Sequence, residues 1–251
     1  MADFGVLILA MAIATFAGVV KGTVGFAMPM VMISGLASFL PAEQALAALI
    51  LPTLVTNLAQ ALRNGLAEAL ASTRHYWRLI VPLCLCVVLS AQLVPLVSQH
   101  ALLLTLGLPI TAFALTQLAG WQWRFRTENR ARAEIATGIL AGLWGGMSGV
   151  WGPPTVAFLL SLDIDKRENL RVQGVIYLIG AVALCVGHAG SGVLNAQSLG
   201  FSALLVLPAS IGLWLGFRLH DRLDPVRFRR GTLIVLTLSG FNLIRRAIAL
   251  D

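Results

Sequence analysis

The chain has 251 residues, of which 58% are hydrophobic and 12% charged, and its mean hydropathy is +0.85. Because soluble domains carry about 25% charged residues, this composition excludes a soluble globular protein and predicts an all-α polytopic membrane protein. The net charge of +7 would suit a nucleic-acid-binding protein, but the arginines lie in short connections between apolar runs, where membrane topology explains them. No nucleic-acid partner is therefore expected.

Eight apolar segments follow one another along the chain. The residues before the first segment include Asp3 and no Lys or Arg, so the basic region of a secretory signal is lacking. We therefore expect the first apolar segment to be retained in the mature protein. Six segments have the length of a single membrane span, and the first and fifth are longer. The segments cover residues 4–40, 44–62, 76–98, 101–120, 133–162, 172–190, 198–217 and 231–249.

The two long segments share a glycine pattern that ends in proline. The pattern G-x3-G-x2-G followed by proline occurs at residues 18–29 and again at residues 145–154, where each glycine lies 127 positions further on. A duplicated apolar segment interrupted by Gly and Pro is typical of the binding site of a repeat-built transporter. We therefore expect a broken or re-entrant helical hairpin at 4–40 and another at 133–162.

Positive charge decides between the topologies. Four connections, after the second, fourth, fifth and seventh segments, hold 15 of the 18 Lys and Arg residues. If all eight segments crossed the membrane, two of these connections would lie on each side, against the positive-inside rule. If the fifth segment folds back at its motif, all four connections become cytoplasmic. One alternative is that the first segment spans the membrane, with the N-terminus inside. If the first segment also folds back, both chain ends lie outside. Residues 1–127 and 128–251 then each contain one hairpin and three spans, which predicts an inverted two-fold repeat.

The charged residues inside the apolar segments indicate the sign of the substrate's charge. All eleven acidic residues lie in connections, at segment ends or near the chain ends, so the mid-membrane carboxylate that proton and cation carriers need is missing. One basic residue, Lys21, lies deep in apolar sequence, where an ammonium is costly unless it is paired or hydrated. This favours an anionic substrate at Lys21; the alternative is that Lys21 caps backbone carbonyls structurally.

The glycine motifs offer a second means of binding an anion. A helix that restarts after a break presents unpaired N–H groups and a partial positive charge. Nearby hydroxyl, amide and aromatic side chains complete the predicted site, and neither a metal nor a cofactor is expected. The predicted substrate-binding residues are Lys21, Gly22, Thr23, Gly25, Phe26, Asn57, Gln60, Ser148, Gly149, Trp151, Gly152 and Pro153.

At residues 18–29 and 148–154 the chain resembles the TauE/SafE family of sulfite exporter-like permeases. Members are built as two related halves, each with a Gly-rich motif followed by Pro near its start, and the resemblance covers essentially the whole chain by layout. The second motif is the closer match, because Phe26-Ala27-Met28 stands where many members have further glycines and Lys21 is less expected.

The resemblance implies transport of sulfite or sulfonate anions across the cytoplasmic (inner) membrane. The implied partners are a small anionic substrate and the lipid bilayer. The sequence leaves open whether the protein forms a homodimer, and whether it imports or exports.

An enzyme is the main alternative. Residues 146–149 match the GxSG motif of rhomboid intramembrane serine proteases, with Ser148 as nucleophile and His188 as base. Against this, Pro153 and Pro154 interrupt the helix directly after the serine, and a protease does not explain the motif without serine at 18–29. A cation or metal permease would need ligand clusters that the segments lack. We therefore predict a transporter whose substrate binds between the two motifs and which works by alternating access, one half moving against the other.

Overall fold

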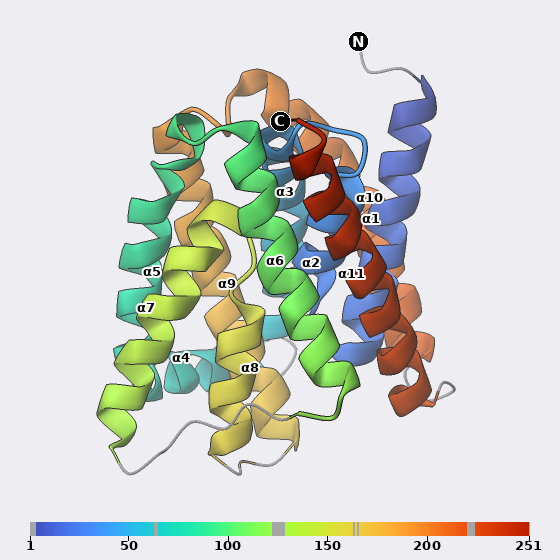
Figure 1. Ribbon diagram of the computed structural model, residues 1–251. Coiled ribbons are helices and arrows are strands. Elements are labelled where there is room, and N and C mark those ends of the chain that lie inside the picture. Colours follow the sequence, from blue (N-terminus) through green and yellow to red (C-terminus); the bar gives the residue numbers. More distant parts are fainter. Residues whose placement is uncertain are drawn as a thin grey trace.

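The structure, a computed structural model, describes residues 4–62, 65–121, 129–162, 164, 166–219 and 224–250, except for the side chains of residues 166, 167 and 225. This part of the chain is a bundle of helices (Figure 1). In chain order they are α1 (Phe4–Val24), α2 (Met28–Leu36), α3 (Ala42–Ala61), α4 (Leu66–His75), α5 (Trp77–Ala91), η2 (Val94–Leu96), α6 (Gln99–Leu118), α7 (Arg130–Ser148), α8 (Gly152–Ser161), α9 (Lys166–Ser191), α10 (Ala196–Leu219) and α11 (Pro225–Ile248).

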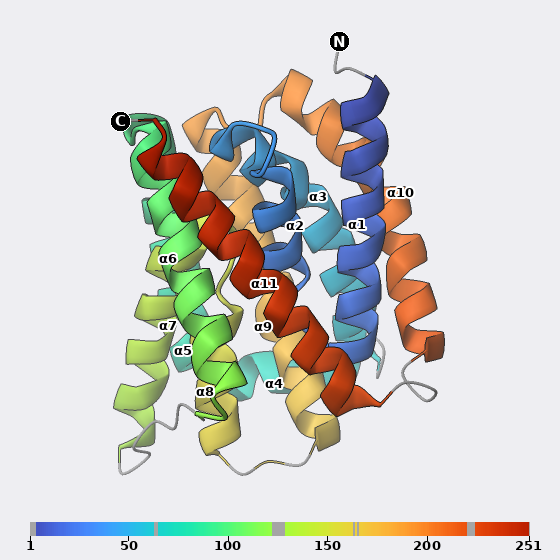
Figure 2. The same ribbon diagram turned by 45° about the vertical axis from the view of Figure 1, so that its right-hand side comes forward.

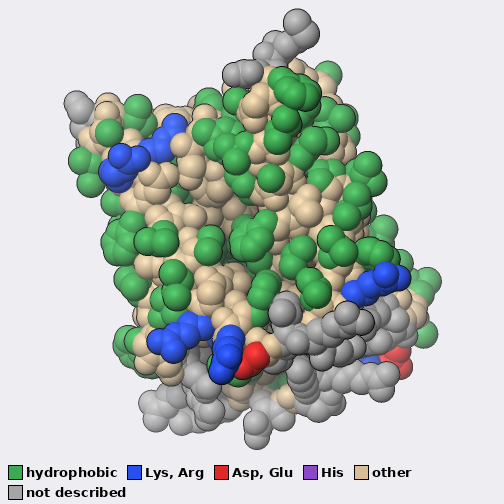
Figure 3. All heavy atoms as spheres, turned by 90° about the vertical axis from the view of Figure 1, so that its right-hand side faces the viewer, with side chains coloured by type: hydrophobic (Ala, Val, Ile, Leu, Met, Phe, Trp, Pro, Cys, Tyr) green, Lys and Arg blue, Asp and Glu red, His purple; other side chains and the backbone are tan. Residues whose placement is uncertain are grey.

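Seven of the described helices are long and apolar enough to cross a membrane: α1, α3, α5 together with η2, α6, α9, α10 and α11. Their large apolar side chains also face outward, as at Leu85, Leu207 and Leu238. In water such exposure would be unfavourable, but in a bilayer these side chains meet lipid. Figure 3 shows hydrophobic side chains spread over the described part of one face of the molecule. The prediction of an all-α polytopic membrane protein is confirmed.

The structure breaks each of the two long segments into one long and one short helix, which we call the first and second hairpin. The long arm α1 ends at a turn with left-handed backbone at Gly25 (φ 87°) and Ala27 (φ 73°), and the chain returns as the 9-residue α2. The 19-residue α7 ends at Gly149 (φ 72°), and the chain returns as the 10-residue α8. In Figures 1 and 2, α1 runs downward into the bundle and α7 runs upward into it, so the two hairpins enter from opposite ends.

The structural correspondence between the hairpins is shifted relative to the sequence pattern. In both hairpins the backbone leaves the long arm through a left-handed glycine, which is Gly25 in the first and Gly149 in the second. The short arms begin at Met28 and Gly152. In each of these pairs the second residue lies 124 positions after the first, whereas the glycine pattern of the sequence pairs residues 127 apart. The difference arises because backbone conformation fixes the structural correspondence, and the sequence pattern mixes turn glycines with glycines that serve packing.

The packing glycines bring the long arms close to neighbouring helices. A Cβ atom added at Gly18 or Gly22 of α1 would overlap the backbone of α10, where Gly212 and Gly216 lie opposite. On α7, three glycines at intervals of four residues lie against backbone carbonyls of α5 in the same way: Gly138, Gly142 and Gly146. Such small-residue seams let backbones approach each other where lipid supplies no hydrophobic force between helices. The seams hold α1 on α10 and α7 on α5.

The connections rich in Lys and Arg start and finish at one end of the bundle. This is the lower end in Figures 1 and 2, where α3, α6, α8 and α10 end, α7, α9 and α11 begin, and α4 lies across the bundle. The basic residues of these connections whose side chains are described are Arg74, Arg78, Arg130, Arg132, Arg171, Arg218, Arg227, Arg229 and Arg230. Arg245 and Arg246 lie near the other end, in the last turn of α11.

The seam between α5 and α7 can be tested by comparing a glycine inside it with a glycine outside it, because alanine should have opposite effects on stability at the two positions. A Cβ at Gly142 would lie 2.6 Å from Cys86 Cβ, whereas Gly200 of α10 has no atom within 4 Å of its added Cβ. We expect Gly142→Ala to lower stability by about 1–3 kcal/mol through overpacking. Gly200→Ala should raise stability by up to about 1 kcal/mol, because alanine favours helix. Unfolding of both variants in detergent measures this, and a stabilising Gly142→Ala would contradict the seam.

Candidate functional site

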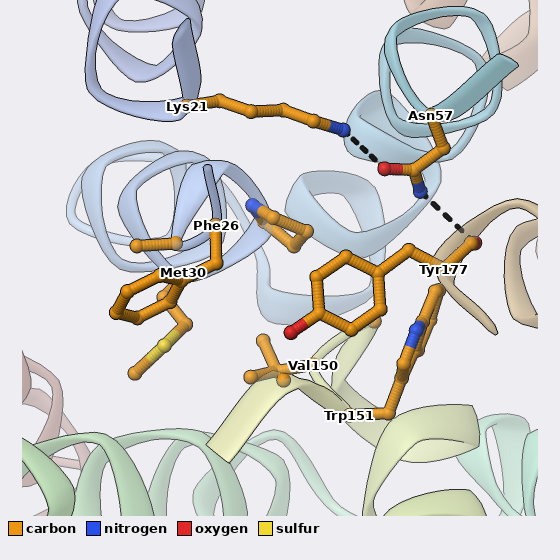
Figure 4. Close-up of a pocket in the computed structure, with 11 residues that line it drawn as sticks. Lys21, Phe26, Met30, Asn57, Val150, Trp151 and Tyr177 are labelled. Atoms are coloured by element: carbon orange, nitrogen blue, oxygen red, sulfur yellow. Dashed lines mark hydrogen bonds between the residues drawn. The ribbon is translucent and has the colours of Figure 1, made fainter. Parts of the chain in front are cut away.

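The two hairpin turns face one cavity inside the bundle (Figure 4). Residues from both turns contribute to it, together with side chains from α1, α2, α3 and α9. The space free for a water-sized molecule is about 20 Å³, a little more than one water requires. The cavity must therefore widen before it can hold a larger solute. Its lining residues are Lys21, Phe26, Ala27, Pro29, Met30, Asn57, Gly149, Val150, Trp151, Gly152 and Tyr177.

Lys21 is the only charged side chain among these lining residues, and it is 2% exposed. Its Nζ donates to Thr56 Oγ1 at 3.1 Å and to Asn57 Oδ1. Both acceptors are neutral, so they solvate the ammonium without cancelling its charge. An ammonium has three N–H donors, and these two hydrogen bonds leave one for another acceptor.

Asn57 connects the lysine to the other half of the chain. Its Nδ2 donates to the backbone carbonyl of Tyr177 on α9 at 3.0 Å, while its Oδ1 accepts from Lys21. Thr56 is fixed by a hydrogen bond of its own hydroxyl to Pro52 O at 2.7 Å. The lysine is therefore held by two side chains of α3 that are themselves oriented.

The Tyr177 hydroxyl is a second donor at the cavity. The residue is 6% exposed, and its hydroxyl oxygen has no hydrogen-bond partner among the described residues. It lies beside the start of α8, where a Cβ added to Gly152 would be 3.3 Å from it. In Figure 4 the hydroxyl points toward the space between Met30 and Val150. An unpaired hydroxyl in an apolar surrounding is costly unless a ligand or water meets it, which indicates a binding position.

The remaining walls are apolar. Phe26 and Met30 lie on the side of the first hairpin, and Val150 and Trp151 on the side of the second (Figure 4). The cavity thus combines two hydrogen-bond donors, one of them charged, with an apolar surface. Such a combination suits a small molecule with one anionic end.

The comparison with known families fits this geometry. A model of the sulfite exporter TauE/SafE family matches residues 10–243, nearly the whole chain.

The chain belongs to this family.

Members of the family are transporters, so the protein is a multi-pass membrane transporter and not an enzyme. No curated protein and no solved structure matches the chain.

The rhomboid-like alternative is therefore wrong, and the local geometry explains the motif differently. Ser148 Oγ donates to Trp144 O at 2.7 Å and accepts from Val150 N at 3.1 Å, so it caps the end of α7. The ring of His188 lies 2.9 Å from Gly146 O through Nε2. Both side chains of the supposed catalytic pair are thus engaged with backbone groups of this TauE/SafE chain.

Six of the twelve predicted site residues line the cavity and six do not. The lining residues are Lys21, Phe26, Asn57, Gly149, Trp151 and Gly152. Among the others, Gly22 packs on Gly216, Thr23 Oγ1 donates to the carbonyls of Val19 and Val20, and Pro153 is buried at the start of α8.

Gln60 and Gly25 support the first turn from outside the cavity. Gln60 Nε2 donates to Gly25 O at 3.2 Å and lies 3.4 Å from Leu170 O of α9. Ser148 has the equivalent supporting position at the second turn through its bond with Val150 N. Whether any of the twelve residues contacts substrate stays a prediction.

Tyr177 is the polar lining residue that the sequence analysis did not include among its candidates. It is one of several polar side chains scattered through the apolar segments, and no motif surrounds it. Its position opposite the α8 start follows from the packing of α9 against α3, which the sequence pattern does not specify. The only feature of the sequence that could have indicated Tyr177 is the presence of a tyrosine within an apolar segment.

The two hydroxyls at the turns should differ in their effect on stability. Tyr177→Phe removes a hydroxyl that has no partner in the described part of the chain, so stability should stay within about 0.5 kcal/mol or rise. Ser148→Ala removes a bonded hydroxyl and leaves Val150 N–H unpaired, which should cost about 1 kcal/mol. Unfolding of each variant in detergent compares them. A larger loss for Tyr177→Phe would mean that its hydroxyl has a structural partner.

Proposed function

We propose that this TauE/SafE protein carries a small sulfur oxyanion, sulfite or an organic sulfonate, through the cavity between the two hairpin turns by alternating access. The observation that carries the proposal is the burial of Lys21 at this cavity with neutral partners alone. A buried ammonium that lacks a carboxylate partner is a poor structural element, because its desolvation is not repaid. A transported anion supplies the missing charge.

The donors around the cavity fit the oxygen atoms of such an anion. The third N–H of Lys21 and the hydroxyl of Tyr177 are free to donate. Each charge-assisted hydrogen bond is stronger than a neutral one, particularly away from water. The apolar walls at Phe26, Met30, Val150 and Trp151 would contact the substituent of a sulfonate.

The arrangement of the helices supports an inverted repeat as the basis of transport. The hairpins enter from opposite ends, and the seam between α1 and α10 has its counterpart in the seam between α7 and α5. Exchange of residues 1–127 with residues 128–251 turns one seam into the other. A site between two such repeats can be open to either side in turn.

The orientation follows from the basic residues. We place the end of the bundle that carries the four Arg-rich connections in the cytoplasm, because positive residues are retained on that side. The first turn of α1 and the last turn of α11 then lie on the outer side (Figures 1 and 2). An inside-negative potential drives a monoanion outward with about 2.3 kcal/mol per 100 mV. In the absence of a coupled ion, export is therefore the downhill direction.

Replacement of Lys21 tests the proposal. Lys21→Met keeps the length of the side chain but removes its charge, so anion binding and flux should fall by about 10-fold or more while the protein still folds. The matched control is Arg218→Met, which removes a cation stacked on Trp214 outside the cavity.

The measurement is flux into proteoliposomes with a panel of sulfite, taurine, an aromatic sulfonate, sulfate and a carboxylate. Unchanged sulfite and sulfonate flux in Lys21→Met, with a folded protein, would remove Lys21 from the site. Flux of the carboxylate alone would contradict an organosulfur substrate.

A further inference from the structure

The described residues that line the cavity carry one formal charge, and this limits the charge of the substrate that can bind there. Lys21 supplies the charge, and among the residues that the structure describes no other Lys, Arg, Asp or Glu side chain lines the cavity. We infer that the site selects monovalent oxyanions, hydrogensulfite or a singly charged sulfonate, against dianions such as sulfate. The inference rests on the proposed function, because it assumes that the substrate binds beside Lys21.

The argument concerns the net charge of the loaded cavity. A monoanion beside the Lys21 ammonium gives a neutral pair, whereas a dianion leaves one uncompensated negative charge. In bulk water that charge would be hydrated, but this cavity has room for about one water and is otherwise walled by side chains such as Phe26, Val150 and Trp151. An unpaired charge in such surroundings is strongly unfavourable.

The supply of hydrogen-bond donors leads to the same selection. Lys21 has one N–H left after its bonds to Thr56 and Asn57, and Tyr177 has one hydroxyl. Two side-chain donors can serve a single sulfonate group whose substituent rests on the apolar wall. A sulfate dianion presents four oxygens, and its second negative charge meets no second cation among the described lining residues.

A neutral ligand is disfavoured for a related reason. A sulfone has oxygens that can accept from Tyr177, but it brings no charge to the buried ammonium. The cavity then keeps its uncompensated positive charge, so affinity should be lower than for a monoanion. Charge, and not the shape of the sulfur group, is therefore the expected determinant.

A series of small ligands with increasing charge tests the inference on the wild-type protein. Dimethyl sulfone is neutral, methanesulfonate and methyl sulfate are monoanions, and sulfate and methanedisulfonate are dianions. Binding is measured in detergent at one pH and constant ionic strength, by calorimetry or by competition with a labelled sulfonate. We expect both monoanions to bind at least about 10-fold more tightly than the neutral ligand and the dianions.

A pair of substitutions at Asn57 tests whether Lys21 sets the selection. Asn57→Asp and Asn57→Leu both remove the amide that donates to Tyr177 O, but only Asp adds a negative charge beside Lys21. Asn57→Asp should lower the preference for methanesulfonate over dimethyl sulfone by about 10-fold relative to Asn57→Leu. Because this preference is a ratio within each variant, it does not depend on the fraction of active protein.

The outcomes separate the inference from the proposed function. If sulfate binds as tightly as methanesulfonate, or dimethyl sulfone does, the charge selection is overturned while transport of organosulfur anions stands. If no anion of the series binds, the proposed function itself fails. An equal preference in Asn57→Asp and Asn57→Leu would overturn the role of Lys21 as the charge that selects.

Discussion

Backbone that leaves helical geometry inside a membrane must find its hydrogen bonds within the protein, because lipid offers none. Both hairpin turns of this transporter meet that requirement locally. Gly25 N donates to Lys21 O in the first turn, and Gly149 N donates to Gly145 O in the second. Gln60 Nε2 also donates to Gly25 O, and Ser148 Oγ accepts from Val150 N. The turns can be stabilised in this way only where other helices surround them. The cavity between them, with its buried lysine, is a result of this placement.

The same requirement operates along the spans. Pro52 interrupts α3 and cannot donate to Ala48 O, and that carbonyl accepts instead from Ser202 Oγ of α10 at 3.0 Å. The hydroxyl also accepts from Leu51 N at 3.1 Å. One serine thus repairs the proline site and fastens α10 to α3. Thr56 and Asn57, which hold Lys21, lie one turn further along this repaired helix, so their position depends on the contact.

Patterns in the sequence were sufficient for the class of fold and for the two breaks, because hydropathy and Gly/Pro interruption are local properties. Lys21, which lines the cavity, could be predicted as a candidate for the same reason, since a charge in an apolar run stands out. Gly22 and Ser148 were placed at the substrate because a glycine or a serine looks the same in a seam, a cap or a site. Tyr177 could not be identified, because its role depends on which face of α9 meets α3 and on the position of α8.

The glycine seams have a consequence for how the molecule can move. Each long arm is fastened to a helix from the other half of the sequence: α1 to α10, and α7 to α5. A rigid-body movement of residues 1–127 against the rest of the chain would break both seams. At these seams glycines lie directly against the backbone of the neighbouring helix. In the proposed alternating access, α1 would therefore move together with α10, and α5 together with α7, rather than one half of the sequence against the other as predicted from the sequence. The proposed repeat unit and the proposed moving unit would then be different parts of the chain.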